Sequence, residues 1–227
     1  MEMVDVETKN GWIEVITGCM YAGKTEELLR RIRRIGFAKK TYLSFRPGID
    51  NRYSKTEIVS HNKNKIQTIV VANAKEIYDF LVEYEKKNNL PYAIAIDEVQ
   101  FFDDAVVDLC EYLADRGVRV IVAGLNTNFK GEPFGIMKDL IARAEYVTKL
   151  SAICQVCGAV ATRTQRIVNG REASYNDEVI LVGATESYEA RCRHCHVVYD
   201  KPDILRKFKW LRIIIHYIVT NILWLSQ

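Results

Sequence analysis

The chain has 227 residues, a length that accommodates one α/β domain and a small second one. With 48% hydrophobic and 27% charged residues, the composition excludes an extended disordered chain and predicts a packed core. Lys and Arg number 32 against 29 Asp and Glu, for a net charge of +3, so the basic excess typical of nucleic-acid wrapping is absent. The acidic N-terminus lacks the basic start and apolar run of a secretory signal, so we expect a cytoplasmic protein.

Apolar periodicity alternates between strand and helix over the first 125 residues. It predicts strands at 12–18, 40–47, 66–73, 92–98 and 118–125, and helices at 23–37, 74–88 and 103–117. This alternation predicts a doubly wound parallel sheet that binds its ligands outside the carboxyl ends of the strands. Cys110 lies in the third helix, where we expect a small buried apolar side chain.

The stretch "GCMYAGKT", residues 18–25, fits the phosphate-binding loop pattern G-x-x-x-x-G-K-[ST] between a strand and a helix. Gly18 and Gly23 let successive backbone amides converge on phosphate oxygens, at a helix N-terminus that favours anions. Lys24 would bridge the β- and γ-phosphates of a nucleotide, and Thr25 would bind Mg²⁺. The four arginines at 30–34 are expected to form a solvated helix face.

Two adjacent acids, Asp97 and Glu98, end the buried strand "YAIAIDE". Neighbouring carboxylates at a strand end are costly unless a metal ion or a reaction needs them. We expect Asp97 to serve the metal and its neighbour to take a proton from an attacking hydroxyl.

Cysteines form two CxxC pairs, Cys154 with Cys157 and Cys192 with Cys195. Four thiolates in this arrangement predict a tetrahedral Zn²⁺ site that holds a small domain together, with a redox pair or disulfides as alternatives. A full set of four thiolates leaves His194 and His196 no ligand role, so we expect surface histidines. The segment 158–191 between the pairs is a candidate lid.

The character of the chain changes near residue 150, where loops, cysteines and short strands such as 178–183 begin. We therefore expect a nucleotide-binding α/β domain over 11–150, a zinc-binding domain over 151–200 and an apolar tail over 201–227. Arg212, His216 and Asn221 interrupt the tail, and its apolar part falls short of a hydrocarbon core of about 30 Å. A packed or oligomer-contacting tail is favoured over a membrane-associated tail or a sequence artefact.

These motifs together resemble the type II thymidine kinase family, which has a P-loop core and a zinc-bearing lasso domain. The resemblance covers roughly residues 11 to 200. Its segments occur in the family's order: "GCMYAGKT", "DNRYS" at 50–54, "IDEVQFF" at 96–102, "GLNTNFKGEPF" at 124–134, "CQVC", "VGATESYEARC" and "CRHC".

The resemblance implies a P-loop, RecA-like parallel sheet and transfer of the ATP γ-phosphate to the 5′-hydroxyl of thymidine, in pyrimidine salvage for DNA synthesis. It implies that Glu98 is the general base, that Arg52 approaches the phosphoryl group and that Asp50 seats the sugar. The implied nucleotide contacts are Gly18, Cys19, Met20, Tyr21, Ala22, Gly23, Lys24, Thr25, Asp97, Glu98, Val99 and Gln100. The implied thymidine contacts are Met20, Asp50, Phe101, Leu125, Phe129, Phe134, Val182, Gly183, Ala184, Thr185, Glu186, Ser187 and Tyr188.

The family pattern is not followed everywhere. Cys19 and Ala22 replace a proline and a serine in the phosphate loop, where the backbone does most of the binding. Asn126 stands where the family usually has Asp, and Ala184 replaces a glycine of the lasso. The resemblance also implies a homotetramer inhibited by thymidine triphosphate. The near-neutral charge disfavours a nucleic-acid partner, and membrane association is likewise disfavoured.

Two other functions compete with this interpretation. A P-loop motor or DNA-dependent ATPase with a zinc ribbon is disfavoured by the near-neutral charge, the short chain and the lasso motif. A catalytically silent relative that binds nucleotide as a regulator is disfavoured by the retention of Lys24, Asp97 and Glu98.

Overall fold

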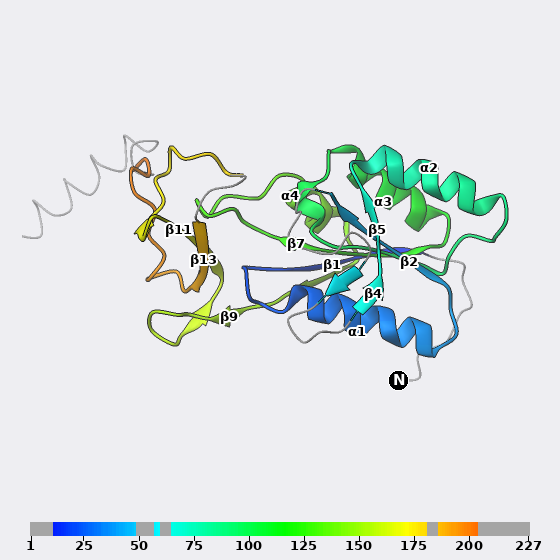
Figure 1. Cartoon of the computed structure of the whole chain (residues 1–227), viewed down its shortest axis with the longest axis horizontal. Helices are drawn as coiled ribbons and strands as arrows, with labels where there is room; N and C mark the ends of the chain where they lie inside the picture. The colour runs from blue at the N-terminus through cyan, green and yellow to red at the C-terminus, as the bar shows by residue number, and fades with distance from the viewer. Residues whose placement is uncertain (1–10, 49–56, 60–64, 181–185, 204–227) are drawn as a thin grey trace, which may run out of the picture.

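A six-stranded parallel sheet with helices on both faces forms the larger part of the computed structural model, which describes residues 11–48, 57–59, 65–180 and 186–203 (Figure 1). The strand order is β5-β2-β6-β7-β1-β8. The strands are β1 (Trp12–Gly18), β2 (Tyr42–Pro47), β5 (Ile69–Val71), β6 (Ala93–Ile96), β7 (Arg119–Leu125) and β8 (Tyr146–Lys149). The helices are α1 (Lys24–Phe37), α2 (Ala74–Glu85), α3 (Ala105–Asp115), α4 (Met137–Arg143) and the short 3-10 helix η1 (Val99–Phe101). The predicted α/β class is confirmed.

The two faces of the sheet bury different side chains, as the alternation along a strand requires. Ile94 and Ile96 of β6 belong to the core cluster that α2, α3 and α4 cover. Ala93 and Ala95 belong to the cluster that α1 covers on the opposite face. Because β1 ends at Gly18 and α1 begins at Lys24, the loop between them sits directly at the edge of the sheet.

The single strand predicted over 66–73 is wrong, because the segment divides at Thr68. Lys65–Gln67 is β4, which pairs with β3 (Glu57–Val59) in a separate hairpin, and Ile69–Val71 is β5 of the main sheet. Thr68 is buried, and its hydroxyl bonds to Ser44 Oγ and Ile66 O. Two further elements, β8 and α4, were not predicted, whereas the predicted burial of Cys110 is confirmed at 0% exposure.

Beyond residue 150 the chain forms a small lobe at one end of the molecule (Figure 1). In it β9 (Ala152–Ile153) pairs with β10 (Val160–Ala161), and β11 (Arg163–Val168) lies between β12 (Arg171–Glu172) and β13 (Glu186–Arg191). The strand predicted over 178–183 is wrong for its described part, since Glu178 to Ile180 form no strand. The domain limits at 150 and 200 stay a prediction, and the tail from residue 204 lies outside the described residues.

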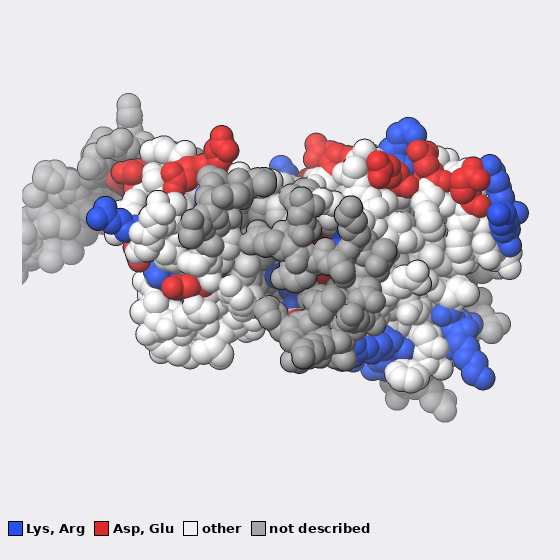
Figure 2. Space-filling view, viewed as in Figure 1, with Lys and Arg blue, Asp and Glu red and all other residues white. Residues whose placement is uncertain are grey.

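Charged side chains of both signs share the face shown in Figure 2, where acidic residues gather over α2 and basic ones lie beyond its end and near α1. None of the helices in the described ranges is long and apolar enough to cross a membrane.

Candidate active site

The phosphate loop joins β1 to α1 in a tight turn that needs its glycines. A Cβ on Gly18 would lie 2.6 Å from the carbonyl oxygen of Leu150, so no side chain fits there. Gly23 has a φ of 82° and is the N-cap of α1, a left-handed conformation that glycine adopts without strain. Tyr21, 52% exposed, has a φ of 63°, whereas Cys19 is buried. The loop therefore presents its backbone at the positively polarised end of α1.

Lys24 and Thr25 connect this loop to the strand that carries the two acids. The ammonium of Lys24 donates to the carbonyl oxygen of Cys19 at 3.0 Å, which keeps the charge over the loop. The hydroxyl of Thr25 donates to Asp97 Oδ2 at 3.1 Å. A hydroxyl and a carboxylate side by side next to a phosphate loop are the groups that hold Mg²⁺ in P-loop enzymes.

Asp97 and Glu98 follow β6 at the carboxyl edge of the sheet. Burial, and then the charge of Glu98, raise the pKa of Asp97 to about 7, although hydrogen bonds from the Glu98 amide and Thr25 and the charge of Lys24 act against the increase. Glu98 itself has φ 50° and ψ 39°, a left-handed conformation unusual for a residue with a side chain. Such strain is commonly retained where a side chain must be aimed.

The two residues that follow the acids, Val99 and Gln100, are buried next to them. Val99 is fully buried and Gln100 is 4% exposed. The side chain of Gln100 donates to Glu98 Oε2 at 2.6 Å and accepts from Leu125 N at 3.1 Å.

The predicted thymidine-contact residues fall into two described groups. Phe101 and Phe134 make an edge-to-face contact at 5.6 Å between ring centroids. Phe129 is buried, and the Arg166 guanidinium lies over its ring at 5.0 Å. Tyr188, half-buried on β13, is the register partner of Arg166 on β11, and so lies beside this second group.

For the side chains of the other predicted residues the structure gives only the burial, or they lie outside the described residues. Met20 is half-buried in the phosphate loop, Leu125 is 9% exposed at the end of β7, and Ser187 is exposed. Six predicted positions lie outside the described residues: Asp50, Arg52, Val182, Gly183, Ala184 and Thr185. Glu186 begins β13, and its side chain is likewise not described. Asn126, which replaces the family's Asp, follows β7 and has a buried Oδ1 without a hydrogen-bond partner among the described residues.

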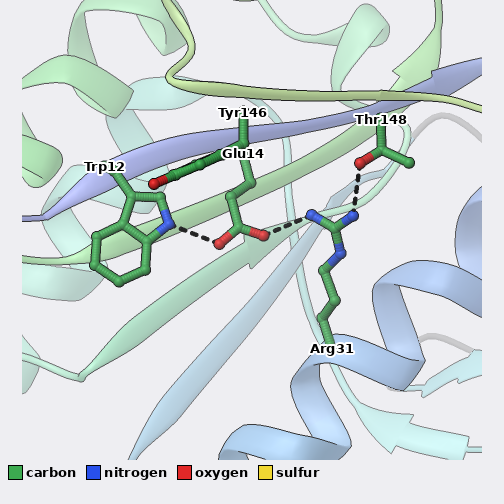
Figure 3. Close-up of a pocket in the computed structure, with 5 residues that line it drawn as sticks. All are labelled: Trp12, Glu14, Arg31, Tyr146 and Thr148. Atoms are coloured by element: carbon green, nitrogen blue, oxygen red, sulfur yellow. Dashed lines mark hydrogen bonds and ion pairs between the residues drawn. The ribbon is translucent and has the colours of Figure 1, made fainter. Parts of the chain in front are cut away.

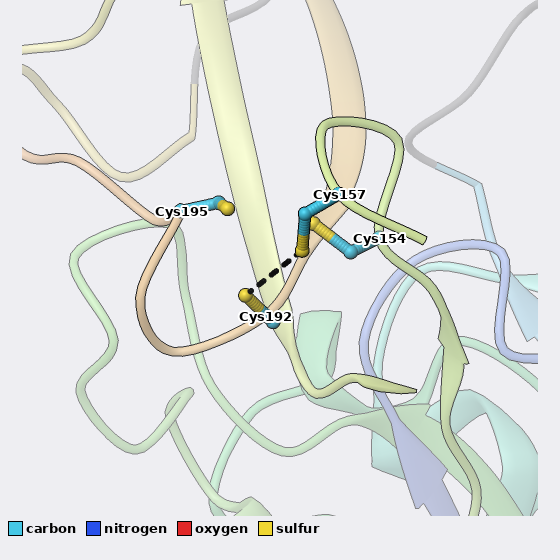
Figure 4. Close-up of side chains that lie close together, drawn as sticks. All are labelled: Cys154, Cys157, Cys192 and Cys195. Atoms are coloured by element: carbon cyan, nitrogen blue, oxygen red, sulfur yellow. Dashed lines mark hydrogen bonds between the residues drawn. The ribbon is translucent and has the colours of Figure 1, made fainter. Parts of the chain in front are cut away.

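The four cysteines of the two CxxC pairs converge in the small lobe (Figure 4). Their sulfur atoms all lie within 4.8 Å of one another, and Cys157 and Cys192 are 3.7 Å apart. Tetrahedral zinc with bonds of about 2.3 Å places sulfurs about 3.8 Å apart, so the cluster fits the ion. Backbone amides, first that of Cys192, lower the pKa of the Cys154 thiol to about 6, which favours the thiolate that a metal needs. The cluster could hold a structural zinc ion.

Both pairs form the same local turn, in which the amide four residues after the first cysteine closes onto its carbonyl oxygen. Gly158 N donates to Cys154 O at 2.9 Å, and His196 N donates to Cys192 O at 3.1 Å. His194 is exposed, as expected, but His196 is half-buried and its Nε2 lies 2.8 Å from Phe129 O. The prediction of a surface histidine is therefore wrong for His196, because it anchors the loop after β7.

Contacts between the small lobe and the site were missed by sequence reasoning. The Thr164 hydroxyl accepts the Met20 amide at 3.0 Å, and Cys19 Sγ donates to Ala161 O at 3.4 Å. Arg166 is fully buried, and its guanidinium packs over the ring of Phe129. No local pattern marks these contacts, because Met20 and Phe129 lie more than 30 residues from Thr164 and Arg166. The cysteine lobe is thereby attached to the phosphate loop and to the loop after β7.

A second buried acid lies far along β1 from the phosphate loop. Glu14, 5% exposed, accepts bonds from Trp12 Nε1 at 2.7 Å and from Arg31 and Arg119 at 2.5 Å each. Arg31 also bonds Thr148 at 2.8 Å, beside a pocket of about 310 Å³ that Trp12 and Tyr146 line (Figure 3). The solvated arginine face predicted for α1 is thus wrong for Arg31, whose side chain is 12% exposed. In this pocket the polar groups of Trp12, Glu14, Arg31 and Thr148 bond to one another.

Comparison with known families agrees with the motifs that the site contains. A family model described as thymidine kinase matches residues 11–196, which covers most of the chain. The matched range includes the phosphate loop, the acids after β6 and all four cysteines. The resemblance to the type II family is thereby confirmed, and the enzyme class with it: the chain belongs to the thymidine kinase family and is a kinase that phosphorylates thymidine.

Proposed function

We propose that the protein transfers the γ-phosphate of ATP to the 5′-hydroxyl of thymidine, giving thymidine monophosphate and ADP for pyrimidine salvage. The observation that carries this proposal is the hydrogen bond between Thr25 and Asp97 at 3.1 Å, with Glu98 next in the chain. It joins a phosphate loop to a buried acid and its half-buried neighbour at one edge of a parallel sheet. This combination is suited to phosphoryl transfer, where positioning and charge stabilisation supply most of the catalysis.

In this proposal the phosphate loop and Lys24 bind the β- and γ-phosphates. Thr25 and Asp97 would hold Mg²⁺, which when bound neutralises the charge of the phosphates. Glu98 accepts the proton of the 5′-hydroxyl as that oxygen bonds to the γ-phosphorus, and the bond to the β–γ bridging oxygen breaks to release ADP. Arg52, which lies outside the described residues, is proposed to approach the transferred group.

The thymine base is proposed to bind between the loop after β7 and the lasso. The contacts of Arg166 and His196 with Phe129 support this, because they fix one wall of such a pocket from the cysteine lobe. The second described wall would be the pair Phe101 and Phe134, with Leu125 and Met20 between the walls. A pocket closed by the lasso would exclude water and suppress wasteful hydrolysis of ATP.

The remaining expectations belong to the same proposal. We propose a cytoplasmic homotetramer that thymidine triphosphate inhibits, since this nucleotide presents the base of the product together with a triphosphate.

The test is transfer of radiolabelled γ-phosphate from ATP, with Mg²⁺, to thymidine, deoxyuridine, deoxycytidine or single-stranded DNA, with products and free phosphate measured separately. Label in thymidine monophosphate is the expected result. Free phosphate that rises only with DNA would indicate a motor instead. Nucleotide binding without any turnover would indicate a silent relative, in which case Asn126, whose buried Oδ1 has no hydrogen-bond partner among the described residues, would be the first position to change to Asp.

A further inference from the structure

Gln100 is a buried polar residue directly below Glu98, and the proposed reaction gives it no role of its own. Its amide is 4% exposed and joins two parts of the site, the acid after β6 and the end of β7. We propose that Gln100 is a positioning residue that holds the Glu98 carboxylate in the orientation that accepts the proton of the nucleoside hydroxyl. The proposal rests on the function proposed above, with Glu98 as the base.

The end of β7 fixes which way the Gln100 amide faces. β6 stops at Ile96, which pairs with Val122, so this strand does not reach the last residues of β7. The Gln100 oxygen instead accepts the Leu125 amide hydrogen at 3.1 Å. Because the oxygen is used in this way, the NH₂ group must point toward Glu98, where it donates to Oε2 at 2.6 Å.

The backbone around Glu98 supports the same arrangement. Its left-handed conformation begins η1, and the turn closes with a bond from Phe101 N to Glu98 O at 3.1 Å. This turn folds the chain back so that the residue two positions later reaches the carboxylate. The neighbouring strand also leaves room for the amide, since a Cβ on Gly124 would lie 2.5 Å from the Gln100 oxygen.

Position matters for Glu98 because a like charge adjoins it. Asp97 precedes it directly, and repulsion between the two carboxylates favours any rotation that separates them. Gln100 is the only hydrogen-bond partner of the Glu98 side chain among the residues that the structure describes. It holds one carboxylate oxygen and leaves Oε1 for the substrate hydroxyl. A base displaced by about 1 Å from its working position loses about a hundredfold in rate.

The first variant is Gln100→Met, which keeps the length of the side chain and removes both hydrogen bonds. We expect kcat to fall about a hundredfold while the KM for ATP stays within about twofold, because the Gln100 amide is bonded to Glu98 and Leu125 and not to the phosphate loop. Ser44→Ala is the matched control, since Ser44 is 2% exposed and its hydroxyl accepts a bond from Thr68 and not from the site residues. The control should lower the melting temperature and leave kcat unchanged.

The decisive measurement is a double-mutant cycle with Glu98→Gln. If Gln100 acts through Glu98, Gln100→Met lowers kcat about a hundredfold in the wild-type protein and less than about twofold in the Glu98→Gln background. An equal loss in both backgrounds would mean a general structural role and would overturn the proposal. So would wild-type kcat in the folded Gln100→Met protein.

A further variant covers the case in which Gln100→Met does not fold. Gln100→Glu keeps an oxygen that can accept the Leu125 amide but turns a second carboxylate toward Glu98, so we expect a folded protein with a similar loss of kcat. Wild-type kcat in this variant would contradict the inference.

If Glu98→Gln alone turned over at the wild-type rate, the base assignment of the proposed function would fail, and the role of Gln100 with it. If the Glu98→Gln protein were inactive and the separate Gln100→Met protein fully active, only the role of Gln100 would be overturned.

Discussion

Two acids of this protein are equally buried but have opposite surroundings. Glu14 on β1 is 5% exposed and Asp97 after β6 is 6% exposed. Burial alone would raise the pKa of Glu14, but hydrogen bonds from Arg119, Trp12 and Arg31 and the charge of Arg119 outweigh it and lower the pKa below 4.5. For Asp97 burial is reinforced by the charge of Glu98, and the pKa is raised to about 7.

The difference separates a structural acid from a candidate functional one. The charge of Glu14 is matched within the fold by two guanidinium groups, so that nothing further is needed to stabilise it. The acids at the site instead repel each other, and among the described residues Lys24 is the cation that acts on Asp97, so their charge favours a bound cation. Burial of a carboxylate is therefore a weak indication of function, and the sign of its neighbours is a much better one.

The largest effect is expected when the functional acid is neutralised. Asp97→Asn should lower phosphate transfer to thymidine by at least about a hundredfold, because the proposed Mg²⁺ ligand is lost. The melting temperature should stay equal to that of the wild type or rise, since a buried carboxylate beside a like charge is removed. A fall in stability like that expected below for Glu14→Gln would erase the distinction between the two acids.

Removal of zinc should affect the cysteine lobe and thymidine binding and should spare the α/β core. With a chelator, we expect thymidine binding to weaken before the α/β core unfolds, because the cysteine lobe holds Phe129 and the Met20 amide. Binding titrations and thermal unfolding on the same samples measure both effects, and added Zn²⁺ should restore binding. Unchanged thymidine affinity in folded, metal-free protein would contradict the coupling.

Neutralising the structural acid should produce the reverse pattern. Glu14→Gln leaves Arg31 and Arg119 without their buried counter-charge and should cost about 3 kcal/mol of unfolding free energy. Transfer to thymidine per folded molecule should be unchanged. Denaturant unfolding together with an activity assay tests this. Loss of turnover without loss of stability would mean that Glu14 is a functional acid and not a structural one.

The smallest effect is a difference in pH dependence, measured without Mg²⁺ or nucleotide. Asp97 has its pKa raised from 3.8 to about 7 on folding, so the stability it contributes is present below pH 3.8 and lost as the pH rises through 7. Glu14 has its pKa lowered, so its contribution is present above 4.5 and lost as the pH falls through the lower folded value. The melting temperature of Asp97→Asn relative to wild type should therefore increase between pH 4 and 7.

For Glu14→Gln the deficit relative to wild type should instead be full above about pH 5 and should shrink in acid. Parallel trends for the two variants would contradict the opposite environments assigned to the two acids.

Sequence patterns predicted what depends on short stretches of chain. The phosphate loop, the buried strand before Asp97 and the cysteine pairs are each defined by spacing over a few residues, and their geometry could be anticipated. The alternation of strands and helices followed from the apolar periods for the same reason. The split at Thr68 was not visible, because nothing in the short stretch around it indicates that the pairing partner changes from β3 to β2.

The connections between distant parts were not predictable. Arg31 has the sequence context of a solvated helix face, and only folding brings Glu14 and Thr148 to it. In the sequence, His196 beside Cys195 gives no sign of its bond to Phe129, nor does Thr164 of its bond to Met20. Gln100 could be placed near the nucleotide by resemblance, but its bonds to Glu98 and Leu125 depend on where β6 ends.

Glu98 as the general base is tested most directly by transfer of γ-phosphate from ATP to thymidine by Glu98→Gln, measured beside its thermal unfolding. We predict a loss of about a hundredfold to ten-thousandfold in turnover, the range for a missing general base, with ATP binding and melting temperature retained. Turnover near the wild-type rate would contradict Glu98 as the base. A collapse of stability in step with activity would instead make Glu98 a structural acid like Glu14.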